Sequence, residues 1–202
     1  MHKIMKNSFI IIVLLATLVL SGVCRAEEPQ KKCLTGIEFF TGFGKAKLHA
    51  QGNYFLAPFI VALDFDIKPP IERLLEKIGI KYPGLIQFQL EPFINTAYSP
   101  YGNVEVGNTF MLKLGFLPET SKFQPYVKAG VGMLYMSQHT REQSTQFNFE
   151  EQGGIGAHYF IKKNIAINAD CRIRHVSNAG IDQPNHGINS LFFLLGATYQ
   201  FD

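Results

Sequence analysis

Residues 165–177 read IAINADCRIRHVS, and apolar and polar side chains alternate along this stretch. An alternation with a period of two indicates a β-strand, because successive side chains of a strand point to opposite faces. The odd positions from Ile165 to Ile173 are apolar. The even positions include Asn168, Asp170, Arg172 and Arg174. This strand is expected to lie between an apolar surface on one side and a polar filling on the other.

The same alternation recurs about eight times along the chain, between turns rich in Gly, Pro and Asn. We expect strands at residues 35–47, 54–66, 85–98, 104–116, 123–137, 147–159, 165–174 and 191–200. One helical pattern interrupts them at residues 69–79, with a Pro-Pro start, apolar residues at helical spacing and Gly79 as the stop. We expect a small amphipathic helix that caps one end of the sheet; a membrane-surface or partner-binding helix is the alternative.

The polar faces of these strands decide the fold class. A soluble sandwich exposes a face rich in Lys, Glu and Thr, whereas here the polar faces mix glycines with charges of both signs. The charged members are Glu38, Glu91, Glu105, Lys113, Lys128, Glu150, Asp170, Arg172 and Arg174. Small residues and compensating charges suit a crowded interior. The pattern predicts an all-β protein: an eight-stranded antiparallel up-and-down transmembrane β-barrel with a polar filled interior, one short periplasmic helix and no pore.

The first 26 residues are typical of an export signal. Lys3 and Lys6 form a basic start, residues 9–20 an apolar run, and Cys24 lies just before a plausible cleavage point after Ala26. Lipidation at Cys24 is the alternative, but Val23 is an unsuitable residue before a lipidated cysteine, so we favour simple cleavage. The domain organisation expected is a cleaved signal peptide at residues 1–26 and a single outer-membrane barrel at residues 27–202.

Composition excludes some classes of function. The chain has 202 residues and a formal net charge of +3 with scattered Lys and Arg, so no nucleic-acid groove is indicated. Cys33 and Cys171 lack the clustered spacing of a metal site, and we expect neither metal nor cofactor. We favour unpaired thiols over a disulfide between them. The chain closes on Phe201 and Asp202, one residue beyond the aromatic end that is usual for such barrels.

Residues 174–189, RHVSNAGIDQPNHGIN, form the connection that follows the seventh strand. With both termini on the periplasmic side, this connection faces outward from the cell. His175 and Ser177 continue the odd, apolar parity, so both are expected on the outer wall, with Asn189 near His175 across the hairpin. Polar side chains that face lipid are usually functional. The alternative is that all three lie among the lipid head groups, where polarity costs little.

The pattern H-x-S-N-A-G, an interval and then P-N-x-G resembles the lipid A 3-O-deacylase (PagL) family. The residues that carry it are His175, Ser177, Asn178, Ala179, Gly180, Pro184, Asn185 and Gly187. The Gly-Gly-Ile-Gly-Ala run at residues 153–157 and the eight-strand layout support the likeness. The family is an outer-membrane esterase that removes the acyl chain ester-linked at position 3 of lipid A.

The resemblance implies Ser177 as nucleophile, His175 as general base, and Asn185 with a backbone N–H near Gly180 as oxyanion donors. Asn178 is a further candidate for oxyanion stabilisation or substrate binding. For Asn178, Gly180, Pro184 and Gly187, turn geometry is an alternative role. The family commonly has a glutamate as third member, and the matching position here is Asn189. An amide oxygen can orient a histidine, but it carries no charge. Weak activity, tuning by the amide, or an acid borrowed from Asp182 or Glu151 remain open; Glu151 is the one charge on the apolar side of its strand.

We therefore expect a hydrolase of the outer membrane whose catalytic residues are Ser177, His175 and Asn189, with lipid A or lipopolysaccharide as substrate and outer-membrane lipids as surroundings. The rival hypothesis is a non-catalytic structural or adhesive barrel. A phospholipid-cleaving or acyl-transfer enzyme on the same wall is the third. The sequence leaves acyl-chain preference and oligomeric state open, a homodimer included.

Overall fold

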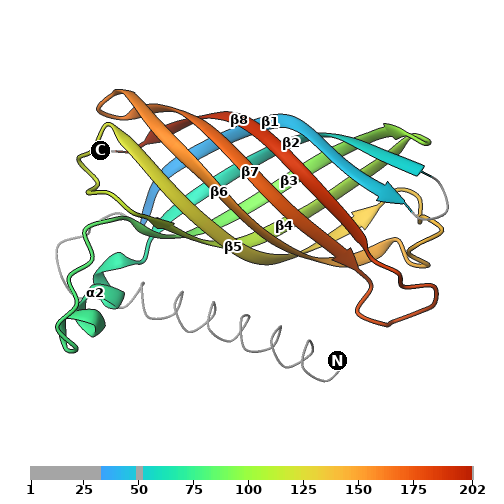
Figure 1. Ribbon diagram of the computed structural model, residues 1–202, viewed down its shortest axis with the longest axis horizontal. Coiled ribbons are helices and arrows are strands. Elements are labelled where there is room, and N and C mark those ends of the chain that lie inside the picture. Colours follow the sequence, from blue (N-terminus) through green and yellow to red (C-terminus); the bar gives the residue numbers. More distant parts are fainter. Residues whose placement is uncertain (1–32, 49–51, 202) are drawn as a thin grey trace.

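The computed structural model describes residues 33–48 and 52–201. Its eight strands form one closed antiparallel barrel in which each strand pairs with its neighbours in the chain and β8 pairs with β1 (Figure 1). The strands are β1 (Leu34–Leu48), β2 (Gly52–Asp66), β3 (Ile86–Ser99), β4 (Asn103–Gly115), β5 (Phe123–Met136), β6 (Phe147–Lys162), β7 (Ile165–Ser177) and β8 (Ile188–Gln200). The predicted fold class is confirmed. The expected signal peptide and Cys24 lie outside the described residues.

Odd and even positions of each strand lie on opposite faces of the barrel wall, as the alternation in the sequence predicts. Along β7, Arg172 and Arg174 are buried inside the barrel, whereas Ile167 and Ile173 are exposed on the outside. Closure pairs every described strand on both sides, so none of these strands has an open edge. Cys171 lies on the outer parity of the same strand, and no disulfide joins it to Cys33.

A network of ion pairs fills the interior toward the end of the barrel that carries the C-terminus and continues past mid-barrel. Lys113 Nζ lies 2.8 Å from Glu38 and 3.2 Å from Asp64, and Lys128 Nζ lies 3.0 Å from Glu91. Further pairs join Arg172 to Glu91 and Asp170, Lys128 to Asp170, and Arg174 to Glu105. These charges are almost fully buried, and each needs its partner because an unpaired buried charge is strongly unfavourable.

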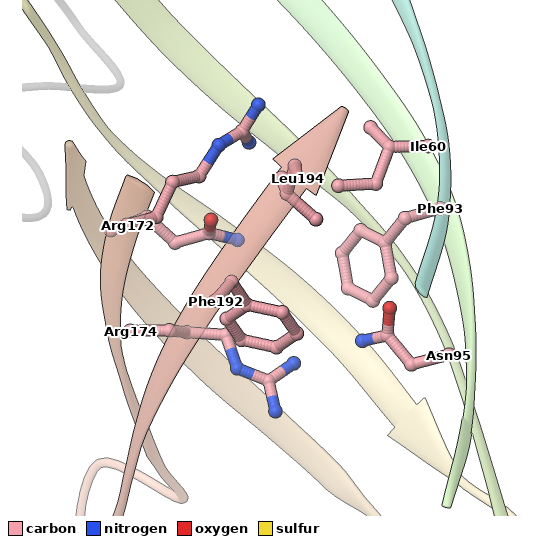
Figure 2. A pocket seen from close by; sticks show the side chains of 8 residues that line it. Ile60, Phe93, Asn95, Arg172, Arg174, Phe192 and Leu194 are labelled. Carbon is pink, nitrogen blue, oxygen red and sulfur yellow. The ribbon is translucent and has the colours of Figure 1, made fainter. Parts of the chain in front are cut away.

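An apolar cluster fills the other part of the interior, where the sequence predicts only a polar filling. It includes Phe40, Tyr54, Leu56, Phe93, Leu134, Met136, Val176, Ile188, Phe192 and Leu194. A small cavity lies where this cluster meets the charges. Figure 2 shows Arg172 and Arg174 on one side of it and Ile60, Phe93 and Asn95 on the other. The Arg174 guanidinium stacks 5.0 Å from the centre of the Phe192 ring. The side chains of the described strands therefore pack the barrel interior.

Helix α2 (Lys68–Glu76) lies in the connection between β2 and β3, at the end of the barrel that also carries the C-terminus (Figure 1). It begins two residues after Asp66, whose Oδ1 accepts a hydrogen bond from the Lys68 N–H (2.9 Å). Two prolines occupy its first turn. The predicted helix is present, although it ends at Glu76, short of Gly79. Among the described residues, no helix is both long enough and apolar enough to cross a membrane.

Candidate active site

The candidate site lies at the end of the barrel opposite α2, which we call the loop end because it carries the connections after β3, β5 and β7 (Figure 1). His175 and Ser177 are the outward-facing residues at the end of β7, and both are half-buried. Arg174 and Val176 point into the interior and are buried. His175 and Ser177 project from the same face because their positions differ by two, and they are on the opposite side of the wall from the cavity of Figure 2.

The pairing of β7 with β8 sets Asn189 directly opposite His175. Asn189 Oδ1 lies 2.7 Å from His175 Nδ1. An amide oxygen only accepts hydrogen bonds, so this contact assigns the imidazole proton to Nδ1 and leaves Nε2 as the acceptor. Within the described part of the chain, no hydrogen bond joins His175 to the Ser177 hydroxyl. Catalytic hydrogen bonds often tighten only when substrate is bound.

Gly187 lies against the imidazole ring of His175. A Cβ atom built on Gly187 would be 2.5 Å from His175 Cε1 and 3.1 Å from Nε2. The residue also has a φ of +76°, in the left-handed region that side chains other than glycine rarely adopt. The positive φ fits the turn geometry expected from the sequence, and the close approach adds a second role, because the missing side chain leaves room for the ring.

Asn178 organises the start of the loop between β7 and β8. Its Oδ1 accepts a hydrogen bond from the Gly180 N–H (2.9 Å), and its Nδ2 donates to the Asp182 carbonyl (2.9 Å) and to Ser144 Oγ (3.2 Å). The backbone then turns through Ala179 and Gly180, whose φ angles are 54° and 80°. Asn178 is fully buried, and its side-chain amide is fully used in these hydrogen bonds, so the residue shapes the loop. The Gly180 N–H already donates to Asn178 and therefore has a partner.

Asn185 is oriented by the same loop. Its Oδ1 accepts a hydrogen bond from the Asn178 N–H at 3.1 Å. The amide nitrogen Nδ2 is therefore the group that points away from this contact, and it has no hydrogen-bond partner among the residues described. Asn185 is half-buried, so Nδ2 is a fixed, accessible donor near the end of β7.

A second loop holds this one in place. The loop between β5 and β6 forms an antiparallel bridge through Gln143 to Asn185. The Ser144 N–H donates to the Pro184 carbonyl (3.0 Å), and the His186 N–H donates to the Glu142 carbonyl (2.9 Å). Residues 140–144 lack the alternation of a strand, and backbone contacts between loops leave no pattern in sequence. Spacing could not have identified this support.

The structure separates the two acids considered as substitutes for a missing glutamate. Asp182 lies in the exposed loop, and its Oδ1 accepts a hydrogen bond from the adjacent Gln183 N–H (2.8 Å). Glu151 lies on β6, directly opposite His175 in the pairing of β6 with β7. Glu151 and Asn189 therefore flank the histidine on its two sides. No group of three or more His, Cys, Asp or Glu side chains suited to a metal ion occurs in the described ranges.

A closed eight-stranded barrel with an apolar outer surface, a charged interior and a serine, a histidine and two asparagines at its loop end defines a small outer-membrane β-barrel of the enzymatic kind. The family model described as lipid A 3-O-deacylase (PagL) matches residues 77–198, which is more than half of the chain. The chain belongs to the lipid A 3-O-deacylase (PagL) family. Membership supports a lipid A deacylase role and a location in the bacterial outer membrane.

Solved structures agree on the fold. The crystal structure of the outer membrane enzyme PagL is similar with a TM-score of 0.59 and 16% identity, over 80% of this chain and 97% of that one. Neisserial surface protein A (NspA) is similar with a TM-score of 0.61 and 13% identity, over 83% of this chain and 97% of that one. At these identities the likeness concerns the barrel alone. No curated protein sequence matches the chain.

Proposed function

We propose that this protein hydrolyses the ester that links the 3-O-acyl chain to lipid A, on the outer wall of the barrel at the loop end. The observation that carries the proposal is the His175–Asn189 contact of 2.7 Å beside Ser177, on the outward face of a barrel in the outer membrane. Lipid A supplies its acyl esters at the outer-leaflet surface. A site on the outer wall reaches such an ester without removing the substrate from the bilayer.

In the proposed reaction, Ser177 Oγ attacks the ester carbonyl carbon and its proton moves to His175 Nε2. The carbonyl oxygen becomes an oxyanion, for which Asn185 Nδ2 is the placed donor. The bond between the carbonyl carbon and the sugar oxygen then breaks, and His175 returns the proton to the leaving 3-hydroxyl. Water, deprotonated by His175, releases the fatty acid from Ser177 in a second addition and elimination.

Asn189 holds the imidazole in this scheme. Its oxygen fixes the proton on Nδ1, so that Nε2 is the base that faces the chemistry. A Cys-His-Asn arrangement serves papain-like proteases in the same way. The amide brings no negative charge to the imidazolium that forms, and this difference from the family glutamate limits what Asn189 can contribute to the rate.

Phe149 gives the acyl chain a surface beside the nucleophile. It is the partner of Ser177 in the pairing of β6 with β7, and its ring packs edge-on against Phe147 at 5.2 Å between ring centres. The two aromatic rings lie on the outer parity of β6. A fatty acyl chain in the outer leaflet can lie along them while its ester reaches Ser177.

The test is incubation of the purified protein with lipid A in detergent, with mass spectrometry of the products. We expect release of one fatty acid from the 3-position, and loss of that release in Ser177→Ala and in His175→Ala. Ser99→Ala and His139→Ala are matched controls, because they remove the same side chains at the loop end from positions that the proposed chemistry does not use. If the wild-type protein releases nothing over a range of detergents and pH, or if Ser177→Ala is as active as the controls, the proposal fails and a structural barrel is the better account.

A further inference from the structure

Glu151 is an anomaly on the outer wall. Among the outward-facing side chains of the described strands, two lysines lie at the end of β1, and Glu151 is the one acidic residue. Its neighbours on that face of β6 are Phe149 and Gly153, and it is exposed. A carboxylate on the outer face of a membrane barrel is unfavourable unless another group makes use of its charge.

The pairing of β6 with β7 places such a group, His175, beside Glu151. Glu151 lies directly opposite His175, and residues directly opposite in an antiparallel pair have Cβ atoms about 4.5–5.5 Å apart. On the other side of the histidine is the uncharged Asn189. The remaining neighbours of the ring are Ile173 and Ser177 on its own strand and Gly187 in the loop. Glu151 is the one formal charge among the groups that face His175 from these elements.

We propose that Glu151 is a positioning residue that supplies, from β6, the negative charge needed by the His175 imidazolium; this role rests on the function proposed above. Asn189 and Glu151 divide one task between two strands. Asn189 fixes the ring and its proton by a hydrogen bond, while Glu151 stabilises the charge that appears when Ser177 loses its proton. Asp182 is excluded from this role by its place in the exposed loop and its bond to the neighbouring backbone.

The expected effect is modest because Glu151 is exposed and water screens its charge. No ion pair joins the Glu151 carboxylate to His175 among the described residues, so the charge acts on the ring from a longer range. We expect Glu151→Gln, which keeps the shape of the side chain, to lower kcat by up to about 5-fold with little change in KM.

Three further variants separate the effect of the charge at residue 151 from the effect of its position. Glu151→Asp keeps the charge and should retain most of the activity. In a Glu151→Gln background, Asn189→Glu restores a carboxylate beside the ring and should recover the lost rate. Glu76→Gln, the same chemical change on exposed α2, should leave kcat unchanged. If Glu151→Gln behaves like Glu76→Gln, the inference is overturned.

A second measurement keeps this inference distinct from the proposed hydrolysis. The imidazole nitrogen chemical shifts of His175 can be compared by NMR at one pH in labelled wild-type, Glu151→Gln and Glu76→Gln protein. A change in Glu151→Gln alone supports the placement of Glu151 beside the ring whether or not lipid A is cleaved. Unchanged shifts in Glu151→Gln protein that hydrolyses lipid A refute the role of Glu151 and leave the proposed function standing.

A different observation, at the opposite end of the barrel, concerns α2. The outward-facing residues Ile86 and Phe88 of β3 are each only 5% exposed, whereas Ile94 farther along the same face is 44% exposed. The cover is the segment that contains α2, because Ile67 and Ile71 pack with Phe88 in one cluster. The start of this segment therefore packs against the outside of the wall, through Ile67 before the helix and Ile71 near its beginning, and this wall lies in the membrane.

Only some of the apolar residues on one side of this segment contact the barrel wall, and the rest are exposed. Leu74, Ile78 and Ile80 are 63%, 68% and 47% exposed, while Glu72, Arg73 and Glu76 occupy the opposite side of the helix. We infer that α2 is an interfacial helix whose exposed apolar residues insert among the phospholipid chains of the adjacent leaflet. The continuity of this stripe with the membrane-facing wall identifies lipid as its occupant.

The absence of tryptophan from the chain makes this inference simple to test. Leu74→Trp and Glu76→Trp each introduce a single tryptophan, on opposite sides of the helix, in protein refolded into vesicles of phosphatidylethanolamine and phosphatidylglycerol with brominated chains. Bromines should quench the fluorescence of the Leu74→Trp variant strongly and that of the Glu76→Trp variant little. Equal quenching in the two variants overturns the inference. Blue-shifted emission without quenching in Leu74→Trp, which indicates a protein contact such as a second copy, also overturns it.

Discussion

Replacement of Gly187 by alanine tests whether the position of the His175 ring matters for catalysis. The added Cβ would lie 2.5 Å from His175 Cε1. Carbon atoms in contact are about 3.5–4.0 Å apart, so the ring or the loop must move by about 1 Å. The same movement disturbs the 2.7 Å hydrogen bond between His175 Nδ1 and Asn189 Oδ1.

The expected loss of rate follows from that displacement. A misplacement of about 1 Å in a catalytic group can lower the rate by about 100-fold. We therefore expect Gly187→Ala to lower kcat for release of the 3-O-acyl chain by about 100-fold, with a smaller change in KM. The left-handed backbone adds a loss of folding stability of roughly 1–2 kcal/mol, because alanine is strained at positive φ.

Gly79→Ala provides a matched control. Gly79 has a φ of +77°, almost the same as that of Gly187, but a Cβ built on it meets nothing within 4 Å. The two variants share the backbone strain, and only Gly187→Ala crowds the imidazole. The assay is lipid A hydrolysis followed by mass spectrometry, with urea unfolding monitored by gel mobility of the folded barrel. Equal kcat in the two variants would refute the reasoning.

Other variants test the oxyanion donor, the loop and the interior. Asn185→Asp keeps the acceptor for Asn178 but removes the Nδ2 donor, and should lower kcat by at least about 100-fold in the same assay. Asn178→Ala removes three loop hydrogen bonds, should destabilise the loop by roughly 1–3 kcal/mol, and can be checked by limited proteolysis. Arg172→Leu leaves Glu91 and Asp170 without this buried partner and should lower the free energy of unfolding by about 3–5 kcal/mol, measured in urea. In the control Lys68→Leu, the lost partner Glu119 is exposed, so the free energy of unfolding should change by about 0–1 kcal/mol.

The barrel could be predicted almost completely because its signal is local. Each strand alternates between an outward and an inward set, and the described strands match the expected ones to within a few residues at their ends. The same parity predicted that His175 and Ser177 share the outer face. The turn that follows β7 and the return of β8 then brought Asn189 opposite His175, as a hairpin requires.

The interior and the loops were less accessible to sequence reasoning. Inward positions such as Phe40, Leu56 and Phe192 are apolar, and their gathering into one cluster depends on which strands meet across the closed barrel. The support that Gln143 and Ser144 give to Asn185 is made largely by backbone atoms of two loops. Backbone contacts are available to any residue, so no residue type marks them in advance.

By itself, the sequence determined which side of each strand faces outward, since side-chain direction depends only on position along the strand, and it thereby placed the histidine and the serine together on the outer wall. Only the tertiary structure decided what lies beside them. The closure and register of the barrel set Glu151 and Asn189 on the two flanks of His175 and place Gly187 against its ring, and Ile67 and Ile71 pack against the outside of the wall. Contacts of this kind join residues far apart in the chain, and they exist only once the strands have paired.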